Sequence, residues 1–184
     1  MTRTILGALI AAAAASSAGA GAAAPTPAAP PGPTAARPDC TPANYRQLDF
    51  WVGSWNVFNT ADNVPYGTSR IERIMNGCAI KETYDAPNAP LGHYTGTSYS
   101  GYDRKDGHWH QMYVDTNGAV TWYGGGLEGS DMALTAAGRG GSLQHMVYRP
   151  QPDGSVRQIG TVSTDQGATW KAGYDYTYRR VINR

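Results

Sequence analysis

The sequence of 184 residues has almost no excess charge of either sign, with a net charge of +1 at pH 7. Its lysines and arginines are interleaved with acids, so it lacks the basic stripe that binds a phosphate backbone. It also lacks a Gly-x-Ser-x-Gly elbow, a glycine-rich phosphate loop entering a helix and a His-Glu-x-x-His pair. We therefore expect no nucleic-acid partner, and the absent motifs favour a protein that is not an enzyme.

The N-terminus lacks a hydrophobic run long enough to cross a bilayer as a stable helix. The apolar run from Ile5 to Ala15 is short, follows Arg3, and precedes Ala18-Gly19-Ala20, a small-x-small cleavage pattern. We expect residues 1–20 to be a cleaved signal peptide, with an uncleaved anchor as the alternative. The chain would then be periplasmic or secreted, with no membrane attachment after cleavage.

The next segment, residues 21–39, has no large apolar side chain and consists mainly of alanine, proline, threonine and glycine. Such a segment cannot bury enough surface to offset its ordering entropy, so we expect a disordered linker. Residues 40–184 then form one folded domain, which is long enough for a sizeable core.

Cysteine is scarce, because the chain has only Cys40 and Cys78. In an oxidising compartment an even pair is most simply a disulfide. This bridge would attach the arm before the first strand to the turn at Asn76-Gly77. The competing interpretation, a reactive thiol, lacks a nearby histidine or helix N-terminus that would lower a thiol pKa.

Sustained helical periodicity is also lacking, apart from one possible turn around Tyr45–Trp51. Tyrosine, tryptophan, threonine and glycine are instead frequent, which is typical of strands and tight turns. Short runs between turn signals predict ten strands, at 54–59, 68–75, 78–85, 93–102, 108–115, 120–124, 132–135, 143–149, 155–164 and 169–181. The predicted fold class is all-β, a single antiparallel up-and-down barrel of about ten strands, because closure removes exposed strand edges.

The first predicted strand begins in Phe50-Trp51-Val52-Gly53-Ser54-Trp55. In an up-and-down barrel the first and last strands are neighbours, and the last one carries Arg180. We expect this arginine to stack on Trp55 and close one end of the barrel through a cation–π contact. Gly53, Trp55 and Arg180 are therefore assigned structural roles, and any chemistry is expected inside the barrel or at its other end.

Gly53-Ser54-Trp55 with Arg180 (or Arg179) resembles the signature of the calycins, which include lipocalins, fatty-acid-binding proteins and nitrobindin-like barrels. The ordered motifs over residues 46–182 are more similar to an uncharacterised family of exported bacterial proteins. These motifs are Phe50–Trp55, Ile71–Ile74, Gly77–Ile80, Trp109–Gln111 and Asp153–Gln158. The resemblance implies a lipocalin-like barrel and no established activity.

The stretch from Ser163 to Trp170 is similar to the Asp-box turn of sialidase propellers, where that turn is structural. Here Ser163 and Asp165 can bond turn amides, Gly167 can adopt positive φ, and Trp170 can pack over the turn. A single copy in a domain of this size predicts a structural turn that joins the two strands of a hairpin.

The positions of the histidines in the sequence give little support to a metal or haem site. His108 and His110 share one face of a strand, but no third ligand is evident nearby, and we interpret them as an exposed pair. Haem would need an axial histidine inside the barrel near the C-terminus, and the last histidine is His145. Only an inward-facing His145 would restore that possibility, so we expect no metal and no cofactor.

Whether the carboxylates of two predicted neighbouring strands share a face of the sheet depends on the register of one hairpin. A two-residue Asn76-Gly77 turn pairs Ile71 with Glu82 and places Glu72 and Glu82 on opposite faces. A three-residue loop with a glycine bulge places both acids on one face, since a one-residue slip reverses every side chain.

In the second register both acids would enter the barrel and join a polar aromatic interior. The candidate ligand-binding residues are Glu72, Glu82, Trp109, Gln111, Tyr113, Trp122 and Gln158. We expect a small polar or aromatic ligand for such a lining. The alternatives are a hydrolase or isomerase that uses Glu72 and Glu82 as acid and base, or a cavity-free structural or interaction module. The oligomeric state is not predicted.

Overall fold

The computed structural model describes residues 39–182, and the predicted signal peptide and most of the predicted linker lie outside this range. Two 3₁₀ turns precede the first strand, and two more occur in loops: η1 Ala43–Arg46, η2 Asp49–Trp51, η3 Met75–Gly77 and η4 Arg139–Gly141. The strands are β1 Gly53–Asn59, β2 Pro65–Ile74, β3 Ala79–Ala86, β4 Tyr94–Asp103, β5 His108–Asp115, β6 Val120–Glu128, β7 Asp131–Ala137, β8 Leu143–Pro150, β9 Val156–Ser163 and β10 Lys171–Arg180.

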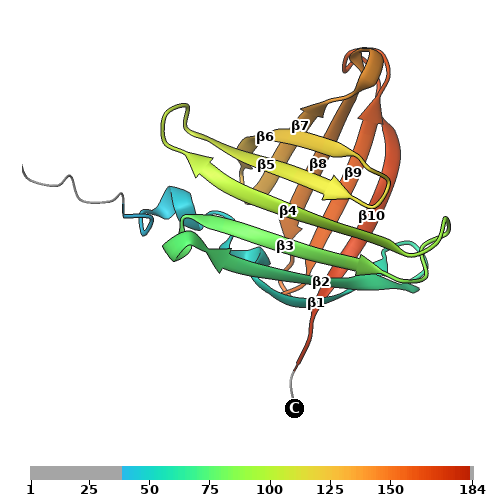
Figure 1. Cartoon of the computed structure of the whole chain (residues 1–184), viewed down its shortest axis with the longest axis horizontal. Helices are drawn as coiled ribbons and strands as arrows, with labels where there is room; N and C mark the ends of the chain where they lie inside the picture. Colours follow the sequence, from blue (N-terminus) through green and yellow to red (C-terminus); the bar gives the residue numbers. More distant parts are fainter. Residues whose placement is uncertain (1–38, 183–184) are drawn as a thin grey trace, which may run out of the picture. The chain divides into compact units, whose positions relative to one another are not determined.

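These ten strands form a single closed antiparallel barrel in which each strand pairs with its neighbours in the chain, and β1 pairs with β10. Figure 1 shows the strands following one another round the barrel, from β1 (teal) through green and yellow to β10 (red). The predicted all-β up-and-down barrel is thus confirmed. Closure gives every strand two partners, which removes the exposed edges that a flat meander would have.

One end of the barrel is filled by the two 3₁₀ turns that precede β1. Leu48, between the two turns, and Trp51, in η2, have no exposed surface and lie in the hydrophobic core. The Trp51 ring packs 4.5 Å from the ring of Tyr148 and 6.4 Å from that of Tyr178. We call this end, which the turns fill, the closed end.

Gly53, Trp55 and Arg180 meet at the closed end. The Arg180 guanidinium lies 4.3 Å from the centroid of the Trp55 ring and donates to the carbonyl oxygens of Phe50 and Val52. Gly53 has φ +149°, and a Cβ there would lie 2.5 Å from an Arg180 nitrogen. The glycine therefore leaves the room that the arginine needs to lie over the tryptophan.

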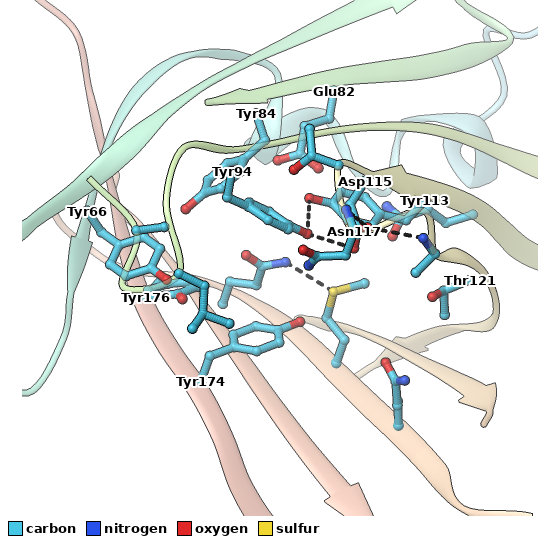
Figure 2. Close-up of a pocket in the computed structure, with 18 of the residues that line it drawn as sticks. Tyr66, Glu82, Tyr84, Tyr94, Tyr113, Asp115, Asn117, Thr121, Tyr174 and Tyr176 are labelled. Carbon is cyan, nitrogen blue, oxygen red and sulfur yellow. Dashed lines mark hydrogen bonds between the residues drawn. The ribbon is translucent and has the colours of Figure 1, made fainter. Parts of the chain in front are cut away.

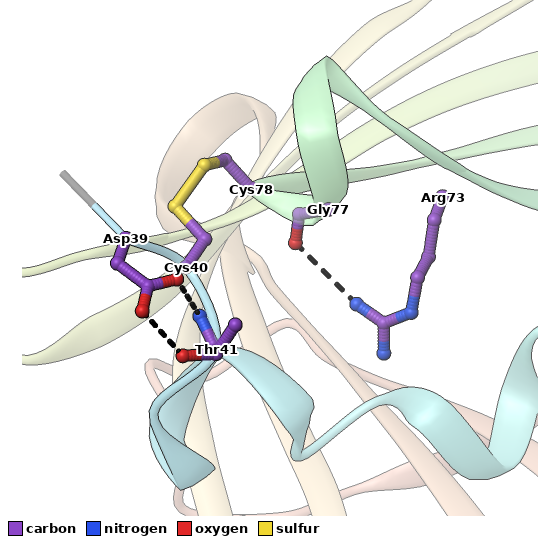
Figure 3. The surroundings of a disulfide bond; sticks show 6 residues. All are labelled: Asp39, Cys40, Thr41, Arg73, Gly77 and Cys78. Carbon is purple, nitrogen blue, oxygen red and sulfur yellow. Dashed lines mark hydrogen bonds between the residues drawn. A yellow bond between two sulfur atoms is a disulfide. The ribbon is translucent and has the colours of Figure 1, made fainter. Parts of the chain in front are cut away.

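A disulfide between Cys40 and Cys78 joins the N-terminal arm to the loop between β2 and β3, as predicted (Figure 3). The cross-link closes a loop of 38 residues. Near it, Arg73 donates to the carbonyl oxygen of Gly77 at 3.4 Å and forms an ion pair with Asp49. The arm that carries the closed-end turns is thus attached to the sheet both covalently and by charge.

The hairpin between β9 and β10 is organised by one aspartate. Asp165 accepts hydrogen bonds from the Ser163 hydroxyl at 2.7 Å, the Thr169 amide at 2.9 Å and the Thr169 hydroxyl at 2.6 Å. The Thr169 hydroxyl and amide bonds are the largest causes that lower the pKa of Asp165 to about 2. Gly167 has φ +94°, and a Cβ there would lie 3.8 Å from the Trp170 ring. These residues hold a turn at the end opposite η1 and η2.

None of the helical turns within residues 39–182 is long and apolar enough to cross a membrane.

Candidate functional site

The interior of the barrel is not solid. A cavity of about 570 Å³ extends from the middle of the barrel to the end opposite η1 and η2, where the β3–β4 and β5–β6 loops line it. Nine of the twelve tyrosines of the chain line this cavity: Tyr66, Tyr84, Tyr94, Tyr113, Tyr123, Tyr148, Tyr174, Tyr176 and Tyr178. A volume in this range is typical of small-molecule sites. We call the end with these loops the mouth.

Glu82 is the buried carboxyl group of the cavity, with a relative exposure of 3%. It points inward from β3, as Figure 2 shows, and accepts hydrogen bonds from Ser69 at 2.8 Å and from Ser98 at 3.3 Å. Burial raises the pKa of Glu82 from its ordinary value of 4.5 to about 7, and the two serine hydrogen bonds offset part of that rise. The group is therefore poised to ionise near neutral pH.

Glu72, the second predicted acid, lies on the outside of the barrel. The β2–β3 register pairs Ile71 with Glu82 and Glu72 with Lys81, which is the register of the two-residue turn. The Glu72 side chain is 41% exposed and forms an ion pair with Arg70 at 2.7 Å. The two acids are on opposite faces of the sheet, so the acid–base pair considered for an enzyme is wrong.

Gln111 and Gln158 were predicted to face the barrel interior. Both are buried and line the cavity. Gln111 donates to the hydroxyl oxygens of Ser100 at 2.9 Å and Tyr148 at 3.3 Å. Gln158 accepts from the Tyr178 hydroxyl at 2.7 Å. These amides fix the orientation of two phenol groups between the cavity and the core.

Tyr113 lies nearer the mouth, in a second polar cluster. The Tyr94 hydroxyl lies 3.0 Å from that of Tyr113 and donates to an Asp115 oxygen at 3.1 Å (Figure 2). The other Asp115 oxygen accepts from the amides of Asn117 at 2.8 Å and Ala119 at 3.2 Å. The β5–β6 turn is thereby tied to the phenols that line the entrance.

Two glycines provide space for the tyrosine rings. A Cβ on Gly160 would lie 2.3 Å from the Tyr174 ring, and one on Gly96 would lie 2.0 Å from the Tyr113 hydroxyl. Any other residue at these positions would push the ring away from the wall. The role of these two glycines was not predicted. Gly160 lies directly opposite Tyr174 on the neighbouring strand, and a glycine in that position is a signal in the sequence.

The two predicted tryptophans are not part of the cavity lining. Trp109 is buried and donates its indole N–H to Gln47 at 2.8 Å, on the side of the closed end. Trp122 is 67% exposed, because β6 turns the next residue, Tyr123, inward. Placing Trp122 in the interior was therefore wrong by one residue of the strand alternation.

Three of the four histidines, His108, His110 and His145, lie outside the cavity lining. His110 bonds Asp106 at 2.8 Å, and the ligand atoms of Asp103, Asp106 and His110 all lie within 4.8 Å of one another on the surface. These are exposed side chains at the β4–β5 turn. His145 is outside the cavity lining and packs against Trp170, so it does not supply the inward ligand that haem would need.

Comparison by sequence adds no relative: no protein-family model matches the chain, and no curated protein matches it. What is established is the closed ten-stranded barrel, its disulfide and its cavity.

Several lining residues were missed from the sequence, above all Tyr84, Tyr94 and the β3–β4 loop from Ala89 to His93. The alternating tyrosines of β10 were a visible signal for an aromatic wall, because residues two apart share a face of a strand.

Proposed function

We propose that this chain is an exported, calycin-like barrel that binds a small polar or aromatic molecule in its cavity. The observation that carries the proposal is the cavity of about 570 Å³ with nine tyrosines in its lining. Ligand sites are concave and mostly apolar or aromatic, with a few placed polar groups, and Glu82, Gln111 and Gln158 are such groups here. The apolar leader and small-x-small pattern of the sequence support a periplasmic or secreted location.

A carrier or sensor of a small molecule fits this arrangement better than a filled structural module. Phenol rings provide wide, rigid faces for stacking together with hydroxyl groups for hydrogen bonds. A space lined by so many buried phenols, rather than filled by apolar side chains, suits a ligand that uses both properties. A fatty acid would find few purely aliphatic walls in this lining.

The proposal is tested by native mass spectrometry of the protein purified from the compartment to which it is exported. We expect a co-purified small-molecule mass on the wild type. Thr121 lines the cavity, whereas Thr135 on the neighbouring strand is exposed, so Thr121→Trp and Thr135→Trp form a matched pair. The first variant should lose the co-purified mass, and the second should keep it.

A wild-type spectrum that shows the bare chain, together with an unchanged melting temperature across a set of small polar and aromatic compounds, would contradict ligand binding. Retention of the mass by the folded Thr121→Trp variant would place the bound molecule outside the cavity.

A further inference from the structure

Glu82 is a carboxyl group enclosed in the barrel without a positive partner. Its two hydrogen-bond donors are the neutral hydroxyl groups of Ser69 and Ser98. None of the ion pairs within residues 39–182 includes Glu82. A buried charge is normally paired, because its removal from water is costly. The ionised form of Glu82 therefore has no charged partner among the described residues.

The described lining of the cavity has acidic groups but no lysine or arginine. Asp115 adds a second carboxyl at the mouth. The one histidine, His93, is bonded to Asp85 at 2.6 Å. A cavity lined by one sign of charge with low-dielectric walls attracts ligands of the opposite sign. The lining selects for cations and against anions.

The tyrosines extend this preference. The faces of aromatic rings carry negative potential and attract organic cations. Figure 2 shows Tyr84 and Tyr94 close to Glu82, with Tyr66, Tyr174 and Tyr176 on the other side of the space. The rings also offer stacking surface to an aromatic body.

An unsatisfied polar atom belongs to a residue on the same strand as the carboxyl group. The Tyr84 hydroxyl is buried, lines the cavity, and has no hydrogen-bond partner within the described residues. Tyr84 is two residues from Glu82 on β3, so both side chains face inward. A ligand that donates to Glu82 brings a hydrogen-bond donor into the part of the cavity that Tyr84 lines.

We propose that the ligand is a protonated primary amine on an aromatic body, with its ammonium group on Glu82 and its ring among the tyrosines nearer the mouth. This assignment rests on the proposed function and specifies the class of molecule that the cavity takes. No covalent step is involved.

The proposal implies a pH dependence of binding. Burial raises the pKa of Glu82 to about 7, and the cation binds its ionised form. Burial likewise raises the pKa of the phenols that face Glu82, so they stay neutral at pH 6 to 8; these are Tyr84 on β3, Tyr94 on β4, Tyr113 on β5, Tyr148 on β8, and Tyr174 and Tyr178 on β10. The other titratable groups of the lining are Asp115, His93, Tyr66, Tyr123 and Tyr176. The ionised fraction of Glu82, and with it the affinity, should rise about tenfold between pH 6 and pH 8.

The test is isothermal titration of the full mature chain with three probes that share an indole ring: tryptamine (a cation), tryptophol (neutral) and indole-3-propionate (an anion). At pH 8 we expect tryptamine to bind at least about tenfold more tightly than tryptophol, the scale of a hydrogen bond to a charged group. Indole-3-propionate should bind more weakly than both.

The Glu82→Gln variant keeps the size of the side chain and removes its charge. It should lose about tenfold or more in tryptamine affinity at pH 8, lose the pH dependence and keep its affinity for tryptophol. Glu72→Gln, on the outer face of the same hairpin, should match the wild type with every probe. Circular dichroism and a melting curve verify that both variants are folded.

Equal affinities for tryptamine and tryptophol, or a Glu82→Gln variant that binds tryptamine like the wild type, would overturn the cation assignment and leave cavity binding intact. Heat from none of the three probes would also overturn it. The co-purified mass of the wild type then decides separately whether the cavity takes a ligand of another class.

Discussion

The Glu82→Gln variant should gain stability relative to the wild type as the pH rises from acidic to mildly alkaline. The pKa of Glu82 is raised from 4.5 to about 7 by burial, so the folded protein holds this proton more tightly than the unfolded chain does. The stabilisation that the proton provides is complete below pH 4.5 and is lost as the pH rises through 7. The interval between the two pKa values corresponds to about 3 kcal/mol at about 1.4 kcal/mol per pKa unit. About 2.5 kcal/mol of that loss falls between pH 5 and pH 8.5.

Urea unfolding curves of the wild type and Glu82→Gln, followed by tryptophan fluorescence at intervals from pH 5 to pH 8.5, measure this effect. The variant has no proton to lose at this position, so its free energy of unfolding relative to the wild type should rise by about 2.5 kcal/mol across the range. All other titrating groups are common to both proteins and cancel in the difference.

Glu72→Gln is the matched control, because the Glu72 side chain is 41% exposed and ion-paired on the outer surface. Its difference from the wild type should stay flat over the same range. A flat Glu82→Gln difference would refute the argument, because a constant offset reports an altered contact and not the titration of a buried acid.

Three further predictions concern the framework of the barrel. Trp55→Ala should lower the free energy of unfolding by about 3 to 5 kcal/mol in urea titrations, because it opens a large cavity beneath Arg180; a melting profile like the wild type would contradict the closed-end assignment. Replacing Cys40 and Cys78 together by serine should cost about 4 kcal/mol in the loop-entropy model, measured against the oxidised wild type; equal unfolding midpoints would contradict it. Gly160→Ala should lower the unfolding free energy by about 1 to 3 kcal/mol by overpacking, whereas Gly126→Ala, which has open space around it, should change it by about 0.5 kcal/mol or less; equal effects of the two would refute the ring-seat argument.

The fold was predictable from the sequence because turn signals and strand runs alternate along the domain without interruption. Ten short strands with tight connections leave closure as the simplest way to pair both edges. The Cys40–Cys78 disulfide was equally accessible, since a chain with two cysteines has a single possible internal pairing. Both inferences depend on chain order alone, and neither needs the direction of any one side chain.

The facing of the two acids was not predictable, because it depends on the backbone of a single loop. Met75, Asn76 and Gly77 all have positive φ, at 52°, 56° and 85°. That sequence of conformations spans the loop while it keeps the pairing of Ile71 with Glu82. Asn-Gly signals a turn of this kind, but positive φ at a methionine is unfavourable, and nothing local announces it.

The inward residue of β6 was misjudged for a related reason. Trp122 and Tyr123 are adjacent, so one of them must face outward, and hydrophobicity alone favours burying the tryptophan. The structure pairs Gln111 directly with Tyr123, and Gly125 with Trp109. The inner face of β5 therefore decides which aromatic ring of β6 enters the barrel, and this is a long-range choice.

The two ends of the barrel differ in what their buried groups can do. At the closed end the Trp55 indole donates to the Trp51 carbonyl at 2.8 Å and Arg180 donates to two carbonyl oxygens, while the Trp51 indole N–H is buried without a partner in the described chain. Glu82, farther toward the mouth, has only two serine hydroxyls, and the hydroxyl of Tyr84 on the same strand has no partner in the described chain. A glutamine at position 82 would fit the same space without the loss of stability that ionisation brings. The presence of a carboxyl group here, and not an amide, is explained by a ligand that stabilises the charged form of Glu82. The aromatic rings around it favour a cation as that ligand.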